Sequence, residues 1–245
     1  MPGRHFGMQN AHALSELRTR AVTRALLLAS VICLLLWGLR AMLAREILWS
    51  CFIWNLFLAW MPLILARWLC GELDRPGRRR WLMAGLFCAW VLFFPNAAYI
   101  VTDLIHLKNR PPVPRWFDYI FITAYGWTGL FLCYVSLRLL HFRVHQWWGQ
   151  RMGWAFAAGM LAAGSFGIYV GRFLRWNSWD MILRPWATLS ELSVFRQPRV
   201  FAEAIAFTGT FFLLSILVYV VLHALAYWHA PHPIEAVRSD RAEQV

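Results

Sequence analysis

Two short polar stretches adjoin long apolar ones, and they hold the side chains best suited to chemistry. The first, FFPNAAYIVTDLIHL, covers residues 93–107. If one helix continues through it, Asn96, Tyr99, Asp103 and His106 lie on one face, within an arc of about 80°. A polar stripe is costly in lipid, so we expect it to face the protein interior or a water-filled cleft. The alternative is a helix end that turns polar as it leaves the bilayer.

The second stretch, GRFLRWNSWD, covers residues 171–180. Arg172 and Arg175 are three residues apart, so on a helix they form one cationic patch. Guanidinium groups bind phosphates and carboxylates through paired hydrogen bonds, which suits an anionic ligand. The predicted substrate-binding residues are Asn96, Tyr99, Asp118, Arg172, Arg175, Asn177 and Asp180.

Three kinds of chemistry fit these residues. In the first, Asp103 and His106, with Asp118 or Asp180, bind a divalent metal ion, since carboxylate and imidazole are suitable ligands. In the second, His106 is a general base oriented by Asp103, and the arginines hold an anionic group such as a phosphate. In the third, the charges form a buried salt-bridge network that joins the helices. The residues alone leave all three open, with Asp103 and His106 as the candidate catalytic pair and the candidate metal ligands.

The elements that must position these residues are long apolar helices. Hydrophobic residues make up 60% of the 245 residues and charged residues only 15%, too few to cover a water-facing surface. Apolar runs of about 20 residues cross the hydrocarbon core as helices, which satisfy their own backbone polar groups. We predict an all-α, polytopic integral membrane helical bundle with about six transmembrane helices over residues 21–228, between mobile cytoplasmic segments at 1–20 and 229–245. The six runs are 25–43, 47–66, 81–102, 119–137, 152–171 and 204–222.

The basic residues predict the orientation. The net charge is +12, but the arginines lie between apolar runs and not along one soluble face. This distribution favours contact with membrane lipid and argues against nucleic-acid binding. Arg75, Arg78, Arg79 and Arg80 form the densest cluster, so we place their side of the membrane, and both termini, in the cytoplasm. Odd-numbered helices run the same way, so both polar stretches share the extracytoplasmic face.

Several residues inside or between the runs have structural interpretations. Gly167 and Gly171 form a GxxxG pair, which predicts a packing seam within the chain or, as the alternative, a homodimer. Arg40 interrupts the first run near its end, and Asn55 lies within the second as a packing or capping group. His141 belongs to a basic connection that we expect to be solvated.

The stretches FFPNAAYIVTDLIHL, RWFDYIF and GRFLRWNSWD together resemble an uncharacterised bacterial integral membrane family, domain of unknown function 1361. The resemblance spans residues 25–225. It implies a multi-pass protein of the bacterial inner (plasma) membrane and brings no assigned substrate or catalytic residue. The family usually has proline where this chain has Ala98. Its recurrent positions correspond here to Pro95, Asn96, Tyr99, Thr102, Asp103, His106, Asp118, Arg172, Arg175, Asn177, Trp179 and Asp180.

Three functions are consistent with this sequence. The first is an extracytoplasmic-facing polar cleft, between the third, fourth and fifth helices, that binds an anionic or lipid-linked small molecule for hydrolysis or transfer. The second is a structural or assembly membrane protein in which the same residues form a salt-bridge network. The third is a small-solute transporter, although the chain has few polar residues at mid-membrane depth and no repeated halves.

Overall fold

The computed structural model describes residues 3–47, 49–77, 79–106, 112–176, 183, 186 and 190–228, without the side chains of residues 3–18, 105, 106, 227 and 228. These residues contain no strand, which confirms the all-α prediction. The long helices are α1 (Gly3–Ala44), α2 (Cys51–Leu73), α3 (Arg80–Tyr99), α4 (Arg115–Phe173) and α7 (Pro198–Trp228), and the 3-10 helices are η1 (Ile100–His106) and η2 (Leu192–Arg196).

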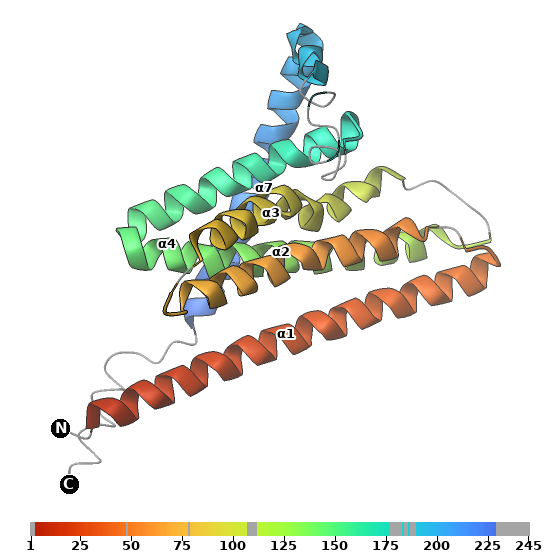
Figure 1. Cartoon of the computed structure of the whole chain (residues 1–245). Coiled ribbons are helices and arrows are strands. Elements are labelled where there is room, and N and C mark those ends of the chain that lie inside the picture. Colours follow the sequence, from red (N-terminus) through yellow and green to blue (C-terminus); the bar gives the residue numbers. More distant parts are fainter. Residues whose placement is uncertain are drawn as a thin grey trace.

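Within the described residues, five helices are long and apolar enough to cross a membrane, which indicates a multi-pass membrane protein. The six expected spans correspond to five helices, because the spans 119–137 and 152–171 both belong to α4. The connection between them is helical except at Gly149, where φ is 82° and ψ is 175°. Glycine adopts this conformation without steric cost. Figure 1 shows α4 turning back on itself, so its two halves lie side by side.

The N-terminal helix is longer than the apolar run that predicts it. α1 begins at Gly3 and so includes most of the segment that the sequence places before the bundle. The C-terminal segment 229–245 lies outside the described residues.

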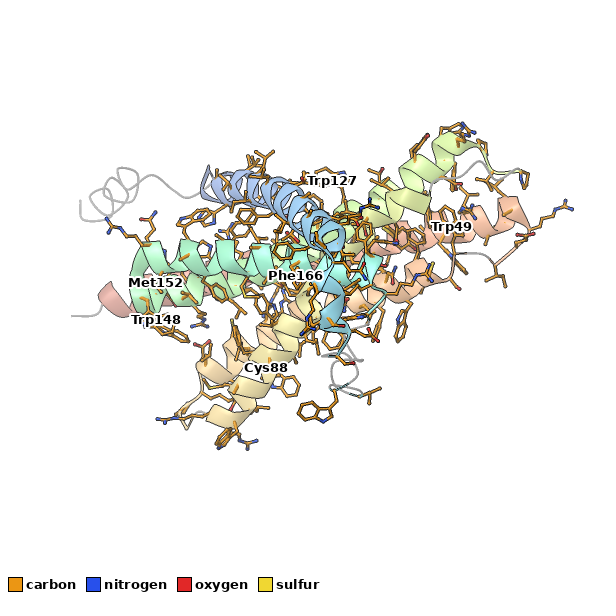
Figure 2. The ribbon with its side chains drawn as sticks, turned by 90° about the horizontal axis from the view of Figure 1, so that it is seen from above. Trp49, Cys88, Trp127, Trp148, Met152 and Phe166 are labelled. Carbon is orange, nitrogen blue, oxygen red and sulfur yellow. The ribbon has the colours of Figure 1, made fainter. Side chains whose placement is uncertain are left out.

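The bundle has two distinct ends. Trp49 marks one end and Trp148, beside the turn of α4, marks the other (Figure 2). At the turn, a Cβ atom built on Gly153 would lie 2.9 Å from the ring of His141, so the halves of α4 are in close contact there. We call this the hairpin end, and the end around Trp49 the charged end.

Aromatic and aliphatic side chains of α2, α3 and α4 fill the core. Trp90 and Phe94 of α3 lie with ring centroids 4.8 Å apart, and Trp90 is fully buried. Phe52 of α2 meets Phe121 and Tyr125 of α4 at 5.0 and 5.2 Å. α1 and α7 pack on this core from outside and leave many large apolar side chains exposed, as expected for lipid-facing helices.

Candidate functional site

An ion pair between Asp103 and Arg172 forms the centre of the charged end. Arg172 Nη2 donates to Asp103 Oδ1, and the side chains are only 9% (Arg172) and 6% (Asp103) exposed. Asp103 belongs to η1 and Arg172 to the last turn of α4, so the pair joins elements 69 residues apart in the sequence. The two polar stretches singled out from the sequence therefore meet directly.

Among the described residues, the guanidinium group of Arg172 also contacts Thr102 and Tyr99, two neighbours of Asp103 in the sequence. Its Nε donates to Thr102 Oγ1 at 2.9 Å, and its Cζ lies 4.2 Å from the centroid of the Tyr99 ring, a cation–π geometry. The Thr102 hydroxyl in turn donates to the backbone carbonyl of Tyr99 at 2.6 Å. Arg172 is thus held on its edge and on its face by residues 99–103.

The other oxygen of Asp103 is also occupied. Asn55, in the second turn of α2, donates from Nδ2 to Asp103 Oδ2 at 3.3 Å. Cys51, at the start of the same helix, is close enough to interact electrostatically with both Asp103 and Arg172. The sequence analysis did not place either residue in the site. Asn55 could have been found, because an amide within an apolar run needs a polar partner.

The local backbone explains why Thr102 and Asp103 reach the end of α4. The α-helix runs through Pro95 to Tyr99 and then tightens into the 3-10 helix η1. A 3-10 helix turns about 120° per residue, against 100° in an α-helix, so the predicted arc does not hold beyond Tyr99. The tighter turn places Thr102 and Asp103 together against Arg172.

A second buried ion pair lies at the same end. Arg40 of α1 donates from Nε to Asp118 Oδ1 at 2.8 Å and from Nη2 to Oδ2 at 3.4 Å, and both side chains are 2% exposed. The Arg40 guanidinium also lies 3.9 Å from the centroid of the Trp49 ring. Asp118 therefore pairs with α1 and not with Arg172. The sequence analysis noted only that Arg40 interrupts the first apolar run. An arginine in such a run needs a buried acidic partner, and this was the signal for the pair.

The structure places the remaining predicted residues differently. Asn96 is half-buried in α3, whereas Arg175 is exposed just beyond α4 with φ of 60°. Asn177 and Asp180 lie outside the described residues, and so does the side chain of His106. Of the predicted substrate-binding residues, the described contacts bring together Tyr99 and Arg172, around Asp103.

The predicted metal site has no further ligand in the described part of the chain. No group of three or more His, Cys, Asp and Glu side chains within it could hold a metal ion. Asp103 is instead taken up by Arg172 and Asn55. The pairing of Asp103 with His106 as metal ligands stays a prediction.

The small residues of α4 pack against α3 within the chain. A Cβ atom on Gly167 would lie 2.5 Å from Pro95 Cγ, and one on Gly171 would lie 3.5 Å from the Tyr99 ring. Both glycines of the GxxxG pair thus pack against α3 of their own chain. This packing holds Tyr99 beneath Arg172. The homodimer through this pair stays a prediction.

Two cavities adjoin the end of α4. One, of about 380 Å³, is lined by Leu174 and Trp176, on either side of Arg175, and by Glu191, Ser193, Val194 and Gln197. The other, of about 420 Å³, is apolar and lies between α4 and α7, with Phe166 and Phe195 in its wall. Figure 2 shows Phe166 where these helices cross.

The charged end thus contains two buried ion pairs, Asp103–Arg172 and Arg40–Asp118. Each of the two buried carboxylates has an arginine partner, and each guanidinium lies against an aromatic ring. Such groups hold helices in place and keep one another oriented.

The sequence comparisons identify a family but no characterised relative. No curated protein and no solved structure matches the chain. The family model described as "Protein of unknown function (DUF1361)" matches residues 54–227, most of the chain, and the chain therefore belongs to this family.

Proposed function

We propose that the charged end is a structural lock and that the protein acts in the membrane as a structural or assembly component. The observation that carries this proposal is that both side chains of the Asp103–Arg172 pair already have partners within the protein. Arg172 is bound by Asp103, Thr102 and the Tyr99 ring, and the second oxygen of Asp103 accepts from Asn55. These hydrogen bonds connect α2 through Asn55, η1 through Asp103 and α4 through Arg172.

The lock also explains why two buried pairs occur at one end. A buried ion pair contributes little net stability compared with apolar side chains, but it selects one arrangement of the elements that carry it. Asp103–Arg172 fixes the end of α3 against the end of α4, while Arg40–Asp118 fixes α1 against the start of α4.

A double-mutant cycle on the central pair tests the lock. We expect Asp103→Asn and Arg172→Gln each to lower the unfolding free energy in detergent by about 3–5 kcal/mol, because each leaves a buried charge unpaired. The double variant should lose much less than the sum of the two. Arg175→Gln, at an exposed position on the same segment, is the matched control. Additive losses, or no loss in either single variant, would contradict the lock.

The second candidate function is binding of an anionic, lipid-linked small molecule, and the two cavities favour it. The cavity lined by Leu174 and Trp176 flanks the exposed Arg175, and the apolar cavity includes Phe195, which is next in sequence to Val194 of the first cavity. A cation beside an apolar groove suits a ligand with an anionic group and an acyl chain. In this function Asp103 and His106 supply acid–base or metal chemistry for hydrolysis or transfer.

Binding of pyrene-labelled phosphatidic acid to the purified protein tests this candidate. Arg175→Gln should weaken binding by removing the cation, and Gly209→Phe should do so by filling the apolar cavity. Gly209 lines this cavity, and no atom lies within 4 Å of a Cβ built on it, so the position is open to a side chain. Gly85→Phe, at an equally open position of α3, is the control. Equal binding by all four proteins would rule the candidate out.

A further inference from the structure

The turn between α2 and α3, at the hairpin end, borders an open cavity far from the charged end. The cavity measures about 660 Å³ and is lined by Asp74, Arg75, Pro76, Gly77, Arg80 and Met83. Gly77 has φ of 85°, the left-handed conformation that glycine allows, and this reverses the chain around the cavity. Most of the lining is therefore one continuous stretch of chain with two arginine side chains.

The charge of this cavity favours an anion. Both carboxylates at the turn already have arginine partners, because Glu72 Oε2 accepts from Arg75 at 2.9 Å and Asp74 accepts from Arg143 of α4. Arg79 and Arg80 are exposed, and neither forms an ion pair within the described residues. The positive charge in excess thus lies at the cavity and has the planar donor geometry that binds phosphate.

The surroundings place the cavity at the level of lipid headgroups. Trp81 follows Arg80 directly and is 90% exposed. Trp148, at the same end, is 63% exposed at the turn of α4 (Figure 2). Exposed tryptophan side chains at the ends of membrane helices lie at the boundary between headgroups and acyl chains. Met83, one turn further into α3, adds an apolar side chain to the lining of the cavity.

We propose that this cavity binds the phosphate-bearing headgroup of an anionic phospholipid. Arg80 contacts the phosphate, and Arg75, held by Glu72, contributes a second set of donors at the cavity wall. The acyl chains then run along the exposed apolar surface that begins at Trp81. The proposal is independent of any role of Asp103 and Arg172, which lie at the opposite end.

Thermal unfolding of the full chain in detergent, with added phosphatidylglycerol, tests the proposal. We expect phosphatidylglycerol to raise the unfolding midpoint, and phosphatidylcholine and inorganic phosphate to raise it much less. Arg80→Gln should require about tenfold more phosphatidylglycerol for half of the rise, since a charge-assisted hydrogen bond is lost. Arg45→Gln, an exposed arginine at the charged end, should behave as wild type.

Three results would overturn the proposal. An equal rise with phosphatidylcholine means that only acyl chains are recognised, and an equal rise with inorganic phosphate means that the ligand is soluble. An equal response of the Arg80→Gln and Arg45→Gln variants places the lipid elsewhere. If Arg80→Gln does not fold, native mass spectrometry of Arg75→Gln replaces it, because Arg75 also lines the cavity, with a weakened phosphatidylglycerol adduct expected and an undiminished adduct contradicting the site.

Discussion

Arg40 and Asp118 face each other in the interior of the charged end, with two hydrogen bonds between the guanidinium group and the carboxylate. The residues are 78 positions apart, and both side chains are 2% exposed. A fully buried pair of this kind is strongly coupled, because removing one partner leaves the other charge in a medium that cannot solvate it.

This coupling can be measured. Arg40→Gln and Asp118→Asn should each lower the free energy of unfolding by about 3–5 kcal/mol, and the double variant should recover part of the loss. Arg45→Gln, one turn later and exposed, should change it by less than about 0.5 kcal/mol. Denaturant titration in detergent measures all four. Independent effects of the two single substitutions would mean that the pair does not hold α1.

Gly129 provides a test of the contact between α3 and α4. A Cβ atom at this position would lie 2.2 Å from the backbone oxygen of Ala97, so alanine cannot fit unless α3 moves. We expect Gly129→Ala to destabilise the protein by about 1–3 kcal/mol or more. Gly159→Ala, on the same helix with no atom within 4 Å, should be neutral or stabilising. Similar unfolding midpoints for both variants would show that α3 does not pack so closely.

The two residues of the GxxxG pair should respond differently to alanine. Gly167→Ala would place a Cβ 2.5 Å from Pro95 and should destabilise the monomer, whereas Gly171→Ala makes an ordinary contact of 3.5 Å with Tyr99. Unfolding midpoints measure the first effect, and light scattering in detergent gives the oligomeric state. A dimer that dissociates in both variants would instead support the homodimer seam.

At the hairpin end, Tyr219 and His141 form a buried hydrogen bond between α7 and α4. The Tyr219 hydroxyl lies 2.7 Å from His141 Nδ1, and the His141 ring stacks on that of His223 at 5.3 Å. Tyr219→Phe should cost about 1 kcal/mol of stability, because it leaves His141 without that partner. Tyr119→Phe, at an exposed site of α4, is the control. Equal unfolding free energies of the two variants would contradict the role of this bond.

The apolar runs predicted the class of fold well because length and hydropathy decide whether a helix can cross lipid. They did not predict how α4 is built. The connection 138–151 is polar and basic, yet it is helical except at Gly149. Its predicted solvation is wrong for His141, which is 3% exposed and packed against Trp154. Helix packing around the turn, which no local pattern encodes, buries that side chain.

The site was predictable where topology alone determines it. Two helices that run in the same direction end on the same membrane face. The sequence therefore predicted that Asp103 and Arg172 lie at one end of the bundle. The choice between partners was not predictable, because it depends on rotation about each helix axis. Asp118 turns toward Arg40, and Asn55 of α2 reaches Asp103, through packing of side chains that are far apart in the sequence.

The position of α4 in both ion pairs has a consequence for how the chain is made. α4 supplies the anion of one pair and the cation of the other, Asp118 near its first residue and Arg172 near its last. The ribosome therefore delivers Arg40 and Asp103 long before their partners, by 78 and 69 residues. Until α4 has been synthesised, both charges lack these partners, and the neutralisation of Arg40 by Asp118 precedes that of Asp103 by Arg172.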